Sequence, residues 1–391
     1  MTAEIAMLNR EGVALAADSA VTFRTSAGLK VLPSANKIFT VSKFHPVGAM
    51  VYGNALLMGA PWELLIKSYR QHLGTRRFAR LEDYAADLIG YLAGSRTLFP
   101  EPEQDAYVLN TAHGNCEDIL REILKAVGAA ISANKQVTEA EILRLARDAI
   151  QQQHAAWTSY PVPSVQSSDL AGRLRTRYAD GIQRVAHEVF EKLPLPDDLY
   201  DLLVESTIAF VSRLSAQADA ETESGLVIAG YGDNDVYPSL RSYRVDAVVA
   251  NELIYTEDPK RHHDVSGSGS AIVPFAQSEM VFAFMEGVDP RYQAALDHEM
   301  RNVLRKFAEI AADASGLPAD ARTELQTALQ GLADQVYADF AQQAAALRMA
   351  QFASPTLAIT QMLPKDELAA MAESLVNLRH CNEITESSTC A

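Results

Sequence analysis

Short apolar runs alternate with polar turns over the first sixty residues of the chain. EIAMLN and GVALAAD lie on either side of the polar residues 9–12, and this pattern predicts a β-hairpin. KIFTVS and VGAMVYG, with KFHP between them, predict a second strand pair. Strands return near residue 224, where SGLVIAGYGDND and PSLRSYRVDAVVANELIY predict one further hairpin.

Helical spacing of apolar residues dominates the rest of the chain. APWELLIKSYRQHL places Trp62, Leu65, Ile66 and Tyr69 on one face of a helix. Residues 75–220 and 290–360 predict helices nearly throughout, and their leucine and isoleucine stripes are typical of core packing. DVSGSGS predicts a turn that leads into another helical stretch, and RHCNEITESSTCA predicts a frayed end.

The order of these elements indicates the fold class. Strands are grouped in hairpins at the start of the chain and again at 224–257, and helical segments follow each group. Hairpins favour antiparallel sheets with helices packed outside them, rather than a parallel doubly wound sheet. We therefore expect an α+β fold in a single domain over residues 1–391, with helical insertions at about 75–220 and 290–360.

Composition excludes several classes of partner. The formal net charge is −16 and no block of lysine or arginine occurs, which argues against nucleic acid or an anionic membrane. No signal-peptide pattern and no membrane-length apolar run is present. The cysteines have no metal-ligand spacing and are odd in number, so we expect a cytoplasmic protein without disulfides; they are Cys116, Cys381 and Cys390.

Thr2 is the first candidate for chemistry. An N-terminal threonine carries its own base, because its free α-amine can accept the proton of its hydroxyl. The initiator methionine is normally removed before a small residue, so we expect processing to expose Thr2 without a propeptide. Many chains begin Met-Thr, so this start alone is a weak indication of an N-terminal nucleophile. The hypothesis therefore depends on the residues around Thr2.

Three further residues strengthen the Thr2 hypothesis. Asp18 ends the second strand of the predicted hairpin, which brings it to the start of the first strand. Lys37 opens the next strand, where an ammonium group can pair with Asp18 and favour the deprotonated amine. Gly53 lies at a predicted strand-to-helix junction, where its N–H can stabilise an oxyanion. Each residue alone is more simply a turn, surface or boundary residue.

TAEIAMLNREGVALAADSAVT, NKIF and VGAMVYGNALLMG together resemble the start of proteasome β-type subunits and their bacterial relatives, which are N-terminal-nucleophile hydrolases. LVIAGYGDNDVYPSLRSYRVD and SGSGSAIVPFAQSE are similar to two later parts of that family, and the matches cover about a third of the chain. The residues that carry the N-terminal resemblance are Thr2, Asp18, Thr22, Lys37, Gly48 and Gly53.

The resemblance implies a fold and an activity. The fold is a four-layer αββα sandwich, and the activity is that of a threonine endopeptidase without a cofactor or metal. Ser268 would lie beside the Thr2 amine. The substrate would be a peptide or unfolded protein, the assembly a homo-oligomer, and an ATP-dependent unfoldase a further partner. The implied substrate-binding residues are Thr22, Phe39, Val51 and Ala55.

The chain departs from the family pattern at its end. No glycine-glycine turn and no closing strand follow residue 360, so the family's last carboxylate and serine have no clear counterpart; Glu373 and Ser387 are available. Two alternatives therefore stay open. One is an inactive scaffold or binding subunit that retains Met1, and the other is an amidase that acts on small molecules.

Two weaker patterns suggest other chemistry. His262, His263 and Asp264 can be interpreted as metal ligands, although adjacent histidines on a loop are usually solvated. His113 and Cys116 can be interpreted as a Cys/His nucleophile pair, although they precede a predicted helix.

Overall fold

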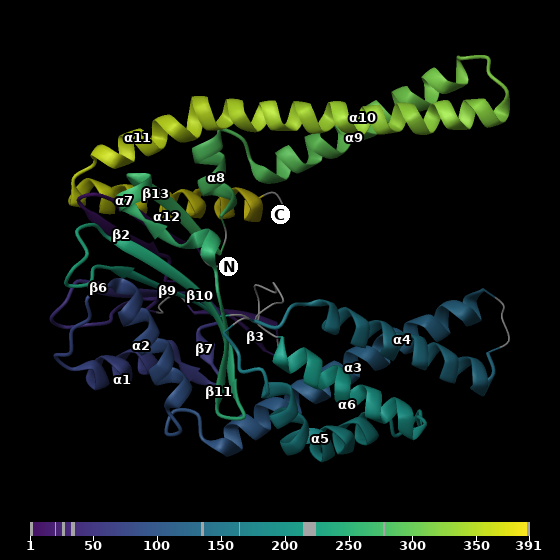
Figure 1. The fold of residues 1–391 in the computed structure, drawn as a ribbon, viewed down its shortest axis with the longest axis horizontal. Coiled ribbons are helices and arrows are strands. Elements are labelled where there is room, and N and C mark those ends of the chain that lie inside the picture. The colour runs from purple at the N-terminus through teal and green to yellow at the C-terminus, as the bar shows by residue number, and fades with distance from the viewer. Residues whose placement is uncertain are drawn as a thin grey trace. The chain divides into compact units, whose positions relative to one another are not determined.

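The chain, drawn as a ribbon in Figure 1, divides into two compact units. The terminal unit comprises residues 1–34 and 264–391, and the central unit comprises residues 35–263. Whether they form one folding domain stays a prediction. The computed structural model describes residues 3–19, 21–25, 28–32, 36–133, 137–163, 165–213, 224–276 and 278–388.

The sheet of the terminal unit has β1 (Ala3–Asn9) at its centre. It pairs antiparallel with β2 (Gly12–Ala17) on one side and with β13 (Ser270–Ala276) on the other. The predicted hairpin is thus confirmed. The stretch after the Gly/Ser turn, which was expected to enter a helix, is instead strand β13. A separate hairpin joins β3 (Val21–Thr25) to β4 (Gly28–Leu32).

One helix covers a face of this sheet. Ile5 and Met7 of β1 pack against Leu368, Ala372 and Leu375 of α12 (Lys365–Ser388). The expectation that RHCNEITESSTCA is frayed is wrong as far as Ser388, because α12 continues to that residue. The other elements of the unit are α7 (Val265–Ser268), α8 (Glu279–Glu286), α9 (Pro290–Asp313), α10 (Ala319–Arg348), η3 (Met349–Ala353) and α11 (Ser354–Met362).

The main sheet of the central unit is also antiparallel, in the order β11-β10-β9-β6-β5. Its strands are β5 (Ile38–Thr40), β6 (Val47–Gly53), β9 (Ser224–Gly230), β10 (Ser239–Val249) and β11 (Glu252–Glu257). The segment PSLRSYRVDAVVANELIY, which was expected to form one arm of a hairpin, therefore forms two strands, β10 and β11. Ala250 and Asn251 connect them with φ of 49° and 60°, the left-handed geometry of a tight two-residue turn.

Two helices cover one face of this sheet, α1 (Trp62–Leu73) and α2 (Leu81–Gly94). Trp62, Leu65, Ile66 and Tyr69 are all buried on one face of α1, as the spacing predicted. Short strands β7 (Leu56–Leu57) and β8 (Ala60–Pro61) precede α1. Short η2 (Pro259–Arg261) follows β11, and β12 (His263–Asp264) lies at the division between the units.

The helical character expected at about 75–220 is confirmed. Beyond α2 this segment comprises α3 (Glu101–Ser132), α4 (Glu139–Ser159), α5 (Leu170–Val189) and α6 (Asp197–Ser212). Thr138 caps α4 by accepting a hydrogen bond from the backbone N–H of Glu141. The second helical segment, at 290–360, is also confirmed by α9, α10 and α11. The α+β class with antiparallel sheets is therefore confirmed.

Candidate active site

Three strand ends meet at the beginning of β1. The backbone N–H of Asp18 donates to the carbonyl oxygen of Ala3 across 3.0 Å, one residue beyond the end of β2. On the other side of β1, Ala3 pairs with Ala276 at the end of β13. The expected approach of Asp18 to the start of the first strand is therefore confirmed. Thr2 itself lies outside the described residues.

Asp18 is held at this edge in a buried position. Only 9% of its surface is exposed. A carboxylate is costly to bury unless other groups compensate for its lost hydration, so this placement is rarely accidental. Asp18 indeed has an interacting partner in the structure. The strand end next to Thr2 thus carries an acidic group shielded from bulk water.

Glu4 is a second buried acidic residue at this edge, and sequence reasoning missed it. Its exposed fraction is 2%, and it lies between Ala17 of β2 and Phe275 of β13. Successive strand residues point to opposite faces, so Glu4 lies on the face of β1 opposite to Ile5. A glutamate in the otherwise apolar run AEIAMLN was the available signal.

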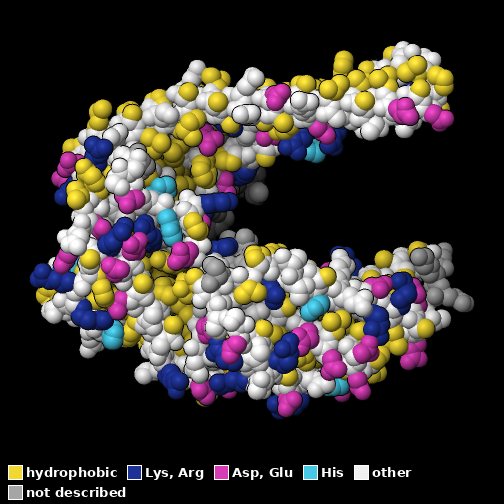
Figure 2. Space-filling model, viewed as in Figure 1, with side chains coloured by type: hydrophobic (Ala, Val, Ile, Leu, Met, Phe, Trp, Pro, Cys, Tyr) yellow, Lys and Arg dark blue, Asp and Glu magenta, His cyan; other side chains and the backbone are white. Residues whose placement is uncertain are grey.

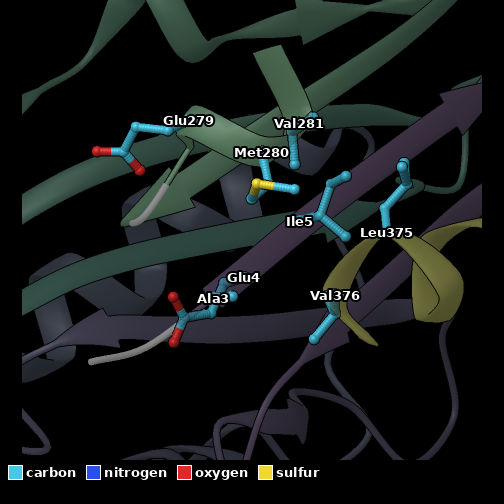
Figure 3. Close-up of a pocket in the computed structure, with 8 residues that line it drawn as sticks. All are labelled: Ala3, Glu4, Ile5, Glu279, Met280, Val281, Leu375 and Val376. Carbon is cyan, nitrogen blue, oxygen red and sulfur yellow. The ribbon is translucent and has the colours of Figure 1, made fainter. Parts of the chain in front are cut away.

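A small cavity of about 30 Å³ lies between β1, α8 and α12. In Figure 3, Ile5, Leu375 and Val376 lie close together, whereas the carboxylates of Glu4 and Glu279 lie away from them. The cavity has room for about one or two water molecules. It is therefore too small to be a substrate pocket, and it marks the inner side of the candidate site.

The end of β13 has an unusual backbone. Ala276 has a φ of 55°, which costs of order 1–3 kcal/mol for a residue with a side chain. Such conformations are concentrated at functional sites. Ser278, two residues on, precedes α8 as its N-cap residue. Sequence reasoning missed this edge because Pro274 and the Gly/Ser turn obscured the strand, although AIVPFA is a six-residue apolar run.

Ser268 does not lie where the resemblance implied. The register pairs Asn9 with Ser270, so Ser268 lies beyond the Asn9 end of β1. At about 3.3 Å per residue, this end is roughly 20 Å from Ala3. The expectation that Ser268 lies beside the Thr2 amine is wrong, because β13 occupies the residues expected to begin a helix. Ser278 lies two residues beyond Ala276, which pairs with Ala3.

Lys37 occupies a buried position in the central unit. It directly precedes β5, is 9% exposed, and its carbonyl oxygen accepts a hydrogen bond of 2.9 Å from the N–H of Val51. Lys37 interacts with another residue in the structure. Asp18 and Lys37 belong to different units, so their pairing stays a prediction.

Gly53 ends β6 with a φ of 76°, a conformation that glycine adopts without strain. Alternate N–H groups of a strand point to the same edge, so the Gly53 N–H lies on the side where Val51 donates to Lys37. The expected helix start beside Gly53 is wrong. Strands β7 and β8 intervene, and α1 begins only at Trp62, so its dipole does not act there.

The expected substrate-binding residues have varied environments. Val51 is buried in the core beneath α1 and α2, and Phe39 packs against that core. Ala55 is half-buried, and its carbonyl accepts from the N–H of Trp62. Thr22 pairs with Val31 in the β3–β4 hairpin, and its side chain lies outside the described residues. Their contact with substrate stays a prediction.

The weaker sequence patterns do not form sites in the described parts of the chain. Cys116 is fully buried in an apolar cluster, and burial raises the pKa of its thiol to about 12, so it is no nucleophile. Burial lowers the pKa of His263. No metal-binding group of three His, Cys, Asp or Glu occurs among the described residues. Among the described helices, none has the length and apolarity to cross a bilayer.

Comparison with known proteins identifies no relative of this chain. No protein-family model matches it, and neither a curated protein nor a solved structure gives a significant match. The function therefore has to be inferred from the residues of the chain itself.

Proposed function

We propose that this chain is a threonine-type peptidase or amidase in which removal of Met1 exposes Thr2 as the nucleophile. One observation carries the proposal: the Asp18–Ala3 hydrogen bond of 3.0 Å places a buried carboxylate beside the residue that follows Thr2. The substrate class we propose is a peptide or an unfolded protein.

The proposal includes the four-layer αββα sandwich that the resemblance to N-terminal-nucleophile hydrolases implies. In that fold the lysine of NKIF, Lys37, lies next to the aspartate of the first hairpin, Asp18, and we propose the same pairing here.

The proposed reaction is acyl transfer. The Thr2 Oγ attacks the carbonyl carbon of the scissile amide, and the hydroxyl proton passes to the Thr2 α-amine. The N–H of Gly53 stabilises the oxyanion of the tetrahedral intermediate. The ammonium formed on Thr2 then protonates the leaving nitrogen as the C–N bond breaks. Water hydrolyses the resulting ester, which releases the acid and restores the hydroxyl.

Lys37 and Asp18 have separate roles in this mechanism. A neighbouring ammonium favours the neutral amine of Thr2, which is the form that accepts a proton. The Asp18 carboxylate compensates the charge of Lys37 and orients it. Both groups are buried, so solvent screens their interaction less than it would at the surface.

The test combines an intact mass with covalent labelling. We expect a mass that lacks Met1 and modification of Thr2 by an electrophile directed at N-terminal threonine. Thr2→Ala should abolish hydrolysis and labelling, and Thr2→Ser should retain part of both because it keeps a hydroxyl. Thr75→Ala, at an exposed loop position, is the matched control.

Each alternative predicts a different result. A retained Met1 blocks the amine and would identify the chain as an inactive scaffold or binding subunit. Labelling of Thr2 with hydrolysis of non-peptide amides, but not of peptides, would identify an amidase for small molecules. Activity of Thr2→Ala above a few per cent of wild type would exclude Thr2 as the nucleophile.

A further inference from the structure

Helices α9 and α10 of the terminal unit form an antiparallel hairpin with a well-packed inner seam. Ala308, Ala312 and Tyr337 are buried along it. The guanidinium of Arg301 lies 4.4 Å from the ring centroid of Tyr337, and Arg305 pairs with Asp334 at 3.4 Å. These contacts account for the packing of the two helices on each other.

A second apolar stripe of α9 takes no part in this seam. Its residues recur at intervals of three, four or seven, so they lie within an arc of about 60° on the helix surface. The stripe consists of Tyr292, Leu296, Val303, Phe307 and Ile310, and the exposed fractions of these side chains range from 41% to 69%.

Helix α10 carries a matching stripe. Leu332, Val336, Phe340 and Leu347 are each about half exposed and lie on one face by the same spacing. At 100° per residue, the α10 stripe is centred about a quarter turn from Tyr337, whereas the α9 stripe is centred well over a quarter turn from Ala308 and Ala312. In antiparallel helices both rotations point to the same side of the hairpin. Figure 2 shows hydrophobic side chains along the α9–α10 hairpin. We name this surface the hairpin face.

The hairpin face is large enough for a stable interface. Its nine apolar side chains, each about half exposed, offer on the order of 800 Å² of apolar surface, which is about what each partner contributes to a standard protein interface. Monomeric proteins rarely expose contiguous apolar patches of this size without a function.

The charges beside the stripe favour a second copy of the chain as the partner. Glu299 and Lys306 are exposed, lie seven residues apart, and flank the α9 stripe on the side away from α10. When two α9 helices cross antiparallel about a two-fold axis near Val303, Glu299 of each copy lies opposite Lys306 of the other. Such self-complementarity is what an isologous interface requires.

We propose that the hairpin face binds the same face of a second copy, so that two α9–α10 hairpins form an antiparallel four-helix bundle. This interface is independent of the chemistry at Thr2. The apolar stripes would form the bundle core, and the pairs of Glu299 with Lys306 would set its direction and register.

The first test measures the oligomeric state by sedimentation velocity at micromolar concentrations. We expect wild type to form at least a dimer, and Val303→Glu with Phe307→Glu to raise the dissociation constant about a hundredfold or more. Both positions are exposed, so the monomer should remain folded. Val236→Glu, at a more exposed apolar residue of the central unit, should leave assembly unchanged. A monomeric wild type would assign the face to a different protein and overturn the proposal.

The second test examines direction. Glu299→Lys alone places like charges opposite each other, and so does Lys306→Glu alone, so each should weaken association. The combined exchange restores opposite charges and should recover it. Equal association of all four proteins would overturn the antiparallel arrangement.

Discussion

The backbone N–H of Asp18 donates to the carbonyl oxygen of Ala3 across 3.0 Å, and this bond extends the β1–β2 ladder by one pair beyond Glu4 and Ala17. The relationship matters because the next residue toward the start of the chain is Thr2. The hairpin thereby holds a buried carboxylate at the strand end where the proposed nucleophile begins. Lys37 is the cation that the proposal brings to the same place.

Replacement of Lys37 should reduce activity severely. Loss of one preorganised electrostatic group typically costs about 2.7–4 kcal/mol of transition-state stabilisation, or roughly a hundred- to a thousandfold in rate. We expect this loss for Lys37→Ala and only slight recovery for Lys37→Arg, because a guanidinium is planar and larger. Initial rates of peptide hydrolysis provide the measurement.

The control for this series is Lys67→Ala, which removes an exposed lysine of α1 and should leave the rate unchanged. In Lys37→Met, the acid limb of the pH–rate profile should move to higher pH, because loss of the cation favours the protonated amine. A Lys37→Ala enzyme with wild-type rate and pH profile would show that Lys37 is only structural.

Asn9→Asp should destabilise the terminal unit strongly. Asn9 is fully buried, and its Nδ2 donates to the carbonyls of Thr360 at 2.9 Å and Leu363 at 2.7 Å. Its Oδ1 accepts from the N–H groups of Glu11 and Gly12. A carboxylate keeps the acceptor but turns a buried charge toward two carbonyls, so we expect a loss of about 2–4 kcal/mol in the free energy of unfolding.

Urea denaturation measures this loss, and its pH dependence supplies a further check. Burial raises the pKa of the new carboxyl, so the deficit should shrink as the pH falls and the group becomes a neutral donor. Asn54→Asp is the matched control, since Asn54 is exposed and its Oδ1 accepts from the N–H of Leu56. Equal stabilities of the two variants would contradict the role of Asn9.

Gly225→Ala should destabilise the central unit through the ring of Tyr52. A Cβ on Gly225 would lie 2.0 Å from Cζ of Tyr52, whose hydroxyl accepts a hydrogen bond of 3.0 Å from Arg261. The ring must move and lose this contact, at a cost of about 1–3 kcal/mol.

A double-mutant cycle isolates this contact. In the Tyr52→Ala background the same glycine substitution should cost much less, with a coupling energy of about 1 kcal/mol or more. Gly90→Ala, on the open surface of α2, should instead stabilise the protein by roughly 0.5–1 kcal/mol. Additive losses in the cycle would refute the steric explanation.

Stability should fall with rising pH above about 8.5 because of Cys116. Burial raises the pKa of its thiol to about 12 in the folded state, whereas an unfolded thiol ionises near 8.5. Between these values the unfolded state loses the proton first, so the folded state is progressively disfavoured as the pH rises. The slope from this one group is at most about 1.4 kcal/mol per pH unit.

Urea denaturation at pH 8, 9 and 10 compares wild type with Cys116→Ala. The variant loses some packing at every pH, so the slopes are compared and not the absolute values. We expect a shallower slope for the variant. Parallel slopes would mean that the thiol is not the group that titrates.

The sequence by itself determined the elements whose signals are local. Alternation around residues 9–12 predicted the β1–β2 hairpin and the approach of Asp18 to the start of β1. Helical spacing predicted the buried face of α1 at Trp62, Leu65 and Ile66. Such patterns are local because each strand or amphipathic helix must bury one face, whatever covers it.

Only the tertiary structure decided the features that depend on distant partners. Pro274 is compatible with β13 because that strand lies at an edge of its sheet, and the pairing of β13 with β1 places Ser268 beyond the Asn9 end of β1, away from Ala3. Ala250 and Asn251 form a turn without glycine because the strands they join pair up to the turn itself, where Val249 lies opposite Glu252. The sequence around Asn9 predicts an ordinary turn residue. In the structure its side chain bonds Thr360 of α11, more than 350 positions away, and no local pattern contains that information.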